Sequence, residues 1–345
     1  MQRMQVFTQH ILQWFDVHGR DLPWRRDRQP YAIWLCEIIM QQTRIAQGTA
    51  YWERFMQTYP RVENLAAASE DDVLRLWEGL GYYSRARNLH TAARQIVQMG
   101  GFPNTLEGIK SLKGVGDYTA AAIASIAYGL PAAVVDGNVY RVLARYFGIE
   151  TPVGSTAAKK EFTDLAQSLL PEDRPGDFNE GMMDFGAMVC TPAAPDCAQC
   201  PLREGCFAYR RNRVETLPVK KEAVAVKERF LVYIYIKSKG EVAIHKRPAG
   251  DIWQGLWEPY LMETADAQAQ AAAGSQSVLP SWADGARLLR GKVRHQLTHR
   301  TLYADFYLLE KDARPSLPDD YRWVKETELD RYAKPRLIEI LLESL

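Results

Sequence analysis

Apolar residues recur every three or four positions over most of residues 1–210, which is the period of helices with one buried face. Gly and Pro break this pattern at several points, including Pro60 and Gly129, where we expect helices to end. Because no strand-like alternation interrupts the series, we predict an all-α domain over residues 1–210. The strongest helical periodicity falls in segments 5–15, 33–45, 73–99 and 119–129.

The pattern changes after residue 210. Residues 211–227 are charged, contain a proline and show no apolar face, which is typical of a linker. Apolar and polar positions then alternate in two runs around a Ser-Lys-Gly turn, as in a β-hairpin, and a third such run and a short helix follow. We therefore predict a smaller α+β domain over residues 228–345. Its strand and helix signals lie at 229–237, 241–247, 297–310 and 334–344.

The chain has 345 residues, enough for two domains of ordinary size, with 43 Lys and Arg against 42 Asp and Glu. This balance alone does not indicate a nucleic-acid-binding protein, so any basic face must arise from local arrangement. The N-terminal segment lacks the apolar core and cleavage site of a signal peptide, and no stretch reaches the roughly 18 apolar residues of a membrane span. We expect a soluble, cytoplasmic monomer without a membrane partner.

Four of the five cysteines lie within seventeen residues, with the spacing C-x6-C-x2-C-x5-C: Cys190, Cys197, Cys200 and Cys206. Without a secretory signal, disulfides are not expected, and four thiols so close can hold a metal ion or an iron–sulfur cluster. Only one pair has the short spacing of a zinc knuckle, and the longer loops suit a cluster at least as well. The cysteine spacing therefore does not decide between a zinc ion and an iron–sulfur cluster. Cys36 lies in an apolar run and is interpreted as a small buried residue.

The segment LKGVGDYTA, residues 112–120, joins two helical patterns. Gly114 and Gly116 permit a tight turn that exposes backbone N–H groups at the start of the next helix, a ready site for an anion such as a DNA phosphate. The alternative is an ordinary helix–helix turn, which this segment alone favours.

Three motifs in this order resemble the helix-hairpin-helix DNA glycosylases of the endonuclease III superfamily: LKGVGDYTA, VVDGNVYRVLAR and the four cysteines. Lys113 stands where the hairpin usually has proline. WLCEIIMQQT, GLGYYSRARNL and VDGNVYRVLAR further resemble the adenine DNA glycosylase family, which appends a Nudix-like domain. The resemblance implies a helix-hairpin-helix over 108–125, a 4Fe–4S cluster in the loop 190–206, and a Nudix-like 8-oxoguanine recognition domain over 228–345.

The resemblance implies a base-excision repair enzyme that hydrolyses the N-glycosidic bond of adenine in duplex DNA, opposite 8-oxoguanine or G, after flipping the base. Such a reaction needs an acid for the leaving base and an anion beside the sugar cation. Glu37 lies in the apolar run AIWLCEIIM, where burial is expected to raise its pKa, whereas a surface glutamate fits these neighbours poorly. Asp136 precedes a helical pattern, and position alone favours an N-cap. The resemblance assigns Glu37 the acid role and Asp136 the anion role, with Tyr118 and Asn138 orienting them.

Tyr118 decides between two kinds of glycosylase. In the superfamily, enzymes that also cleave the strand have a lysine at this position, and its amine forms a Schiff base with the sugar. A phenol cannot form one, so we predict a monofunctional enzyme. The alternatives are a pyrimidine-lesion glycosylase with lyase activity and a non-catalytic DNA-binding module whose cluster senses redox state.

The resemblance also implies residues that contact DNA. Gln42 and Tyr82 match intercalating positions, although a polar helix residue and a core tyrosine are the alternatives. Leu297, Thr298 and His299 stand where the family reads 8-oxoguanine with Phe-Ser-His, or they belong to a strand. Three residues match positions at the edge of the family's adenine pocket: Arg20, Trp24 and Arg25. Glu180 is a further candidate for a position near the bound base.

Two further expectations concern the appended domain and the cysteine loop. The segment ADAQAQAAAG lacks the acidic cluster of a Nudix hydrolase helix, so we expect a recognition module without pyrophosphohydrolase activity. No step of the chemistry needs an electron. We therefore predict that the cluster orders the loop from Asp196 to Arg203 to meet the DNA backbone.

Overall fold

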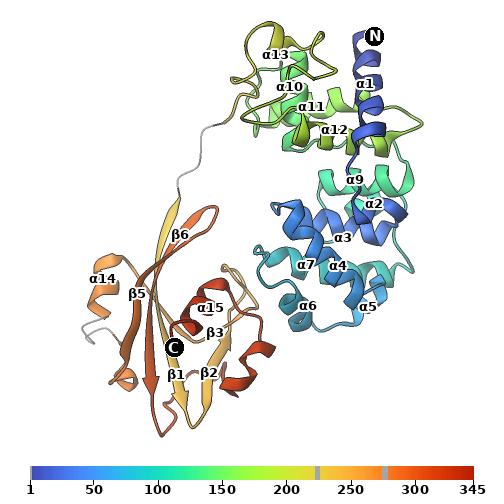
Figure 1. Cartoon of the computed structure of the whole chain (residues 1–345). Helices are drawn as coiled ribbons and strands as arrows, with labels where there is room; N and C mark the ends of the chain where they lie inside the picture. Colours follow the sequence, from blue (N-terminus) through green and yellow to red (C-terminus); the bar gives the residue numbers. More distant parts are fainter. Residues whose placement is uncertain (1, 222–225, 274–278) are drawn as a thin grey trace. The chain divides into compact units, whose positions relative to one another are not determined.

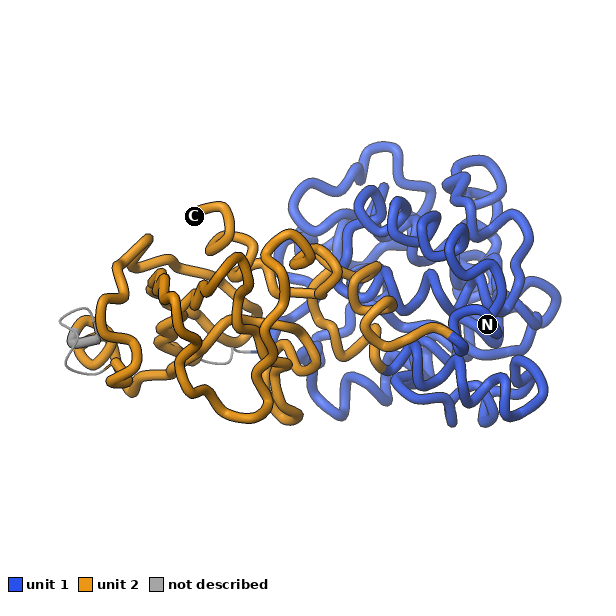
Figure 2. Tube along the Cα trace, turned by 90° about the horizontal axis from the view of Figure 1, so that it is seen from below, with its two compact units in different colours: residues 1–67, 88–222 blue, residues 68–87, 223–345 orange. Residues whose placement is uncertain are grey.

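The computed structural model describes residues 2–221, 226–273 and 279–345. It forms two compact units (Figure 1, Figure 2). Unit 1 comprises Met1–Ala67 and Asn88–Glu222, and unit 2 comprises Ala68–Arg87 and Ala223–Leu345. Residues 68–87, predicted as part of the helical domain, are thus grouped with the C-terminal residues.

Unit 1 is all-helical, as predicted for this part of the chain. Its helices are α1 (Gln2–His18), α2 (Pro23–Asp27), α3 (Pro30–Met40), α4 (Ile45–Thr58), α5 (Val62–Ala67), α8 (Leu106–Lys110), α9 (Asp117–Tyr128), α10 (Gly137–Phe147), α11 (Thr156–Leu169), α12 (Pro175–Met188) and α13 (Phe207–Arg210), with most of α7 (Ser84–Gln98). Helix α6 (Glu70–Leu76) and the start of α7 belong to unit 2. Among the residues described up to 221, the β structure is an isolated bridge between Val153 and Lys220.

Helix α9 lies at the centre of unit 1. Every residue from Thr119 to Ile126 is buried, and most are alanine or isoleucine. Helices α3, α8 and α12 pack around it. The small side chains allow close approach: a Cβ on Gly176 of α12 would lie 2.7 Å from the Ser125 carbonyl oxygen. This packing brings the side chains of α3, α9 and α12 to one region of the unit.

The turn between α8 and α9 is a helix-hairpin-helix, as predicted. Gly114 has a φ of +78°, which favours glycine, and a Cβ there would lie 2.7 Å from Cβ of Asn88. Lys113, which replaces the usual proline, donates its backbone N–H to Oε1 of Gln95 at 2.7 Å. The turn is therefore held by a hydrogen bond that proline could not make.

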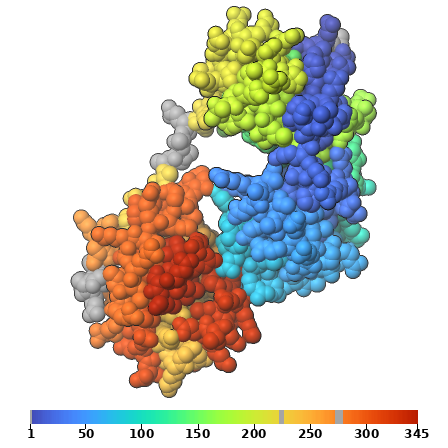
Figure 3. Space-filling model, in the orientation of Figure 1, coloured from blue at the N-terminus to red at the C-terminus, as the bar shows by residue number. Residues whose placement is uncertain are grey.

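Unit 2 is built on one mixed sheet with the order β3-β2-β1-β6-β5, while β4 pairs with β1 and β7 with β2. The central strands β1 and β6 run parallel, and β5 forms an edge. One apolar layer includes residues of α15, which is visible on the surface of Figure 3 in dark red. The strands and helices are β1 (Lys227–Ser238), β2 (Glu241–Lys246), β3 (Trp257–Glu258), β4 (Tyr260–Thr264), α14 (Ala267–Ala273), η1 (Ser281–Ala283), β5 (Arg287–Gln296), β6 (Arg300–Glu310), β7 (Tyr321–Lys325), η2 (Glu326–Arg331) and α15 (Arg336–Leu342).

The α+β class and the predicted hairpin are confirmed, but two expectations need correction. Residues 297–299 are not strand residues, because they form the turn between β5 and β6. The predicted linker, 211–227, is partly packed on unit 1: Leu217 is buried and its carbonyl accepts a hydrogen bond from Nε of Arg145 at 3.0 Å. Residues 222–225 of that segment lie outside the described residues. In the described parts of the chain, no helix is long and apolar enough to cross a membrane.

Candidate active site and cysteine loop

Glu37 projects from α3 among apolar neighbours. Cys36, Ile38 and Ile39 are buried, whereas the Glu37 side chain keeps partial solvent access. Desolvation by the surrounding protein raises the pKa of Glu37 to about 7. A hydrogen bond with the Tyr118 phenol and the charge of Arg25 act in the opposite direction, and nearby carboxylates add to the rise. Glu37 can therefore hold or release a proton near neutral pH.

Asp136 is the N-cap of α10. Its Oδ1 accepts hydrogen bonds from the N–H groups of Asn138 at 2.9 Å and Val139 at 2.8 Å, and its Oδ2 accepts one from Nδ2 of Asn138 at 2.8 Å. Burial raises the pKa of Asp136, while these three donors and the charge of Arg141 favour the carboxylate. The cap predicted from position is present, and one side of the carboxylate is fixed by the helix terminus.

Tyr118 and Asn138 hold the two carboxyl groups in place. The Tyr118 hydroxyl lies within hydrogen-bonding distance of Glu37 and of Sδ of Met183, which is 3.3 Å away, and its one proton can be donated to either. Burial and the nearby carboxylates raise the pKa of Tyr118 well above its ordinary value, so the phenol keeps its proton. Asn138 accepts a hydrogen bond from Arg141 at 2.7 Å through Oδ1, which orients its amide toward Asp136.

A buried ionic network joins α2 to α12 beside this region. Asp184 has no exposed side-chain surface and accepts hydrogen bonds from Arg25 at 2.8 and 3.0 Å and from Nε of Arg20 at 2.9 Å. Burial acts to raise the pKa of Asp184, but the hydrogen bonds from Arg25 and Arg20 outweigh it and lower the pKa. Arg25 also pairs with Glu180 at 2.7 Å, and Arg28 with Glu180 at 3.0 Å. Burial raises the pKa of Glu180.

Asp184 and Arg28 were not predicted as site residues from the sequence. The available signal was the acidic spacing in DFNEGMMDFG, which places Glu180 and Asp184 one helical turn apart on the same face. Trp24, one of the residues predicted for the edge of the adenine pocket, lies in the short helix α2. It is 6% exposed and packs edge-on against Trp52, with 5.8 Å between ring centroids, so it supports α2 from the core.

Both predicted intercalating residues have left-handed backbone conformations. Gln42 follows α3 with a φ of +58° and is exposed, and Tyr82 has a φ of +48° with 44% of its surface exposed. Such angles are uncommon outside glycine and are concentrated at functional positions. The core alternative for Tyr82 is wrong. Within unit 2, the Tyr82 and Thr298 hydroxyl groups form a hydrogen bond.

The turn Leu297–His299 is anchored at both ends. The Leu297 N–H donates to the Arg300 carbonyl at 2.8 Å, and the Lys227 N–H donates to the His299 carbonyl at 3.1 Å. Leu297 packs against the apolar core of unit 2, while Thr298 and His299 are exposed. The His299 imidazole at the tip of this turn is therefore accessible to a ligand, whereas a ligand of the Thr298 hydroxyl would share or replace its hydrogen bond with Tyr82.

The start of α9 matches the expected anion site in part. Gly116 is the N-cap of α9 and makes no side-chain cap hydrogen bond to the first N–H groups of the helix. Asp117 forms ion pairs with Lys110 and with Lys159, and their hydrogen bonds lower the pKa of Asp117 to about 2. A fixed negative charge thus lies beside the turn.

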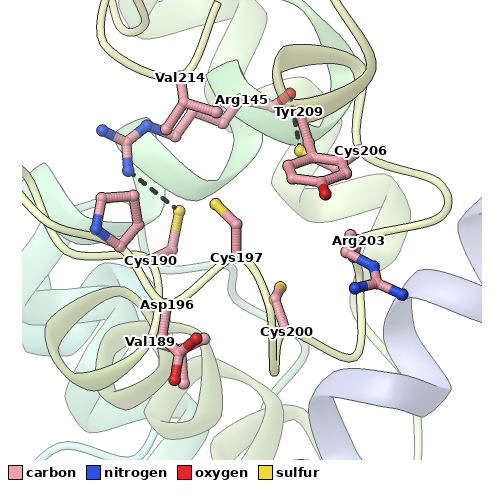
Figure 4. Close-up of a pocket in the computed structure, with 11 residues that line it drawn as sticks. Arg145, Val189, Cys190, Asp196, Cys197, Cys200, Arg203, Cys206, Tyr209 and Val214 are labelled. Carbon is pink, nitrogen blue, oxygen red and sulfur yellow. Dashed lines mark hydrogen bonds between the residues drawn. The ribbon is translucent and has the colours of Figure 1, made fainter. Parts of the chain in front are cut away.

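The four clustered cysteines line one cavity between the ends of α12 and α13 (Figure 4). Arg145 of α10 donates to Sγ of Cys190 at 3.4 Å, and Cys206 donates to the Arg145 carbonyl at 3.5 Å. Burial raises the pKa of Cys200 to about 12 and also raises the pKa of Cys197 and Cys206. Burial therefore favours the neutral form of these thiols, and a bound cationic centre would favour the thiolates.

Known proteins match both the helical part and the C-terminal α+β part of the chain. Residues 35–169 match the HhH-GPD superfamily of base excision DNA repair proteins, and residues 231–344 match the NUDIX domain. The chain is 35% identical to adenine DNA glycosylase of Mus musculus over 92% of this chain and 74% of that protein. It is also 35% identical to adenine DNA glycosylase of Buchnera aphidicola, over 73% of each chain. The structure of a thermostable thymine-DNA glycosylase superposes with a TM-score of 0.56 and 32% identity, over 61% of this chain and 98% of that one.

Proposed function

Because this chain belongs to the adenine DNA glycosylase family, we propose that it removes adenine opposite 8-oxoguanine or G by base flipping and hydrolysis, without cleaving the strand itself. The observation that carries this proposal is the pair of carboxyl groups, Glu37 and Asp136, which lie close enough for the charge of Asp136 to raise the pKa of Glu37. Each has its own hydrogen-bond partner, Tyr118 for Glu37 and Asn138 for Asp136. Adenine departs poorly as an anion, so the reaction needs a proton donor as well as an anion near the sugar.

Glu37 supplies the proton. With a pKa of about 7, it is protonated in a substantial fraction of molecules at neutral pH and can donate to a ring nitrogen of the flipped adenine. The Tyr118 hydroxyl fixes the orientation of the carboxyl group. Once ionised, Glu37 can accept a proton from the attacking water, so one residue serves both halves of the reaction.

Asp136 stabilises the positive charge that develops on the sugar. Its carboxylate is held by three hydrogen bonds from Asn138 and Val139. A fixed anion stabilises the transition state more than the neutral substrate, which is the requirement for lowering the barrier. Because Tyr118 occupies the position of a Schiff-base amine, this site provides no covalent route to strand cleavage.

The network of Arg20, Arg25 and Glu180 forms the edge of the adenine pocket in this proposal. Glu180 is buried and forms ion pairs with two arginines. Its carboxylate oxygens have further acceptor positions, and one of them can accept a hydrogen bond from the exocyclic amine of adenine. Gln42 of unit 1, exposed and in a left-handed conformation, fills the space left by the flipped base. Tyr82, which shares these two properties, contacts the DNA from unit 2. The backbone N–H groups at Gly114 and Gly116 bind a phosphate.

Unit 2 reads the opposite base. Thr298 and His299 are exposed at the tip of the β5–β6 turn, where a hydroxyl and an imidazole can hydrogen-bond 8-oxoguanine, while Leu297 anchors the turn in the core. Helix α14 has the sequence AQAQAAA, with no carboxylate to hold a metal ion for pyrophosphate hydrolysis. Unit 2 therefore acts through binding and not through chemistry of its own.

The cysteine loop fits a 4Fe–4S cluster. Cys190, Cys197, Cys200 and Cys206 all line one cavity. Their C-x6-C-x2-C-x5-C spacing matches the cluster loop of the superfamily that the chain resembles. The bound cluster would join the ends of α12 and α13 through four Fe–S bonds. Its role is to order the loop from Asp196 to Arg203 against the DNA backbone.

The test is excision from a labelled duplex carrying adenine opposite 8-oxoguanine, followed by alkali, with G and T opposite adenine and a T:G duplex as comparisons. We expect strand breaks only after alkali, with A opposite 8-oxoguanine preferred. A complex trapped by borohydride would indicate a lyase. Release of thymine alone would assign the site to the substrate of the thymine-DNA glycosylase neighbour.

A further inference from the structure

The edge strand β5 carries a row of unpaired cations. Its sequence, RLLRGKVRHQ, contains no acidic residue, and its Arg and Lys side chains are all exposed: Arg287, Arg290, Lys292 and Arg294. Several other cations of unit 2 are neutralised, as Arg229 is by Asp251 at 2.6 Å and Arg336 by Glu339 at 2.8 Å. In the described residues, none of the four β5 cations forms an ion pair. In a chain with nearly balanced charge, such a concentration is a local basic surface.

A bulge in the middle of β5 shapes this row. The pairing with β6 shifts between Arg290 and Val293, and Lys292 has a φ of +58°. Asp305 of β6, only 9% exposed, accepts the Lys292 N–H at 2.6 Å, and a Cβ on Gly291 would lie 3.2 Å from its Oδ1. A buried carboxylate thus holds the strained backbone. Bulges held in this way re-aim the neighbouring side chains, here Arg290 and Lys292.

We propose that the exposed edge of β5 binds the phosphate backbone of duplex DNA next to the site of base recognition. Arg294 lies three residues before Leu297, where the β5–β6 turn begins, so the cation row starts at that turn. From Arg287 to Arg294 the strand spans about 23 Å at roughly 3.3 Å per residue. DNA phosphates of one strand recur about every 3.4 Å of helix axis, so the row can contact several of them. The placement beside the opposite base rests on the proposed function of the turn.

The test compares the wild-type protein with Arg290→Gln/Lys292→Gln for binding to an undamaged duplex at several KCl concentrations. Loss of two phosphate contacts is expected to reduce the slope of log K against log salt by about 1.8, at roughly 0.9 for each contact. The affinity loss would then be about 12-fold larger at about 50 mM than at about 200 mM salt. The matched control is Lys239→Gln/Lys311→Gln, which removes two exposed cations of the same unit that lie outside β5. Its slope is expected to match that of the wild type.

An unchanged slope in the β5 variant, with folding verified by circular dichroism, would overturn the proposal. An equal decrease in the control variant would also overturn it, because the effect would then reflect net charge. If the β5 variant instead forms oligomers with an unchanged slope, the cations serve to prevent pairing between strand edges. Excision of adenine opposite 8-oxoguanine with enzyme in saturating excess is measured in parallel. If the wild-type protein excises no adenine in this assay, the proposed function is contradicted, but the role of β5 in binding DNA is not.

Discussion

The pKa of Glu37 gives the sharpest prediction. The rise from 4.5 to about 7 favours the neutral carboxyl by roughly 3 kcal/mol, at about 1.4 kcal/mol per pKa unit. At pH 7, about half of the molecules then carry the proton, against roughly 0.3% for an ordinary glutamate. If Glu37 is the acid, the single-turnover rate of adenine excision should fall about eightfold between pH 7.5 and pH 8.5. The assay is excision by excess enzyme, quenched with alkali across this range.

The raised pKa of Glu37, which provides an acid for catalysis, lowers the stability of the folded protein at neutral and higher pH. The folded state holds the proton more tightly than the unfolded chain, so stability falls as pH rises from about 4.5 to about 7 and is level above that. Glu37→Gln should therefore inactivate the enzyme yet raise the free energy of unfolding at pH 8 by up to about 3 kcal/mol. The matched control Glu53→Gln removes an exposed carboxyl of α4 and should change neither quantity. A Glu37→Gln protein no more stable than the wild type at pH 8, with a flat wild-type rate profile, would refute the reasoning.

Four further predictions follow from the contacts. Asp136→Asn should slow excision by about 10²–10³-fold with little loss of stability, measured by single-turnover kinetics and urea unfolding, because Asn caps a helix about as well as Asp. Asp184→Asn should lower the free energy of unfolding by about 3 kcal/mol or more, since it leaves two arginines without their buried partner. Cys200→Ser should lose the visible absorbance of the cluster, thermal stability and DNA affinity together; retention of all three would contradict the structural role. Thr298→Ala should reduce the preference for 8-oxoguanine over G about fivefold, the equivalent of one hydrogen bond, while Thr298→Ser should retain it.

The sequence predicted local properties better than tertiary ones. The apolar run around Glu37 indicated that this carboxyl would be buried and its pKa raised, and the cap at Asp136 depends on the next three residues, so both could be inferred from the chain. The ion pair of Arg20 with Asp184 joins residues 164 positions apart, and no local pattern indicates which charges will meet. The position of Leu297 to His299 was also missed. A turn lies within that alternating run, and alternation does not show where a strand begins.

The central claim is that this site removes adenine by hydrolysis and leaves the strand intact. The most direct measurement is a single-turnover reaction on a duplex with adenine opposite 8-oxoguanine, divided into portions treated with alkali, left untreated or treated with borohydride. We predict a strand break only after alkali, no trapped covalent complex, and loss of the product in Asp136→Asn. Cleavage without alkali, a complex trapped by borohydride, or undiminished activity in Asp136→Asn would contradict it.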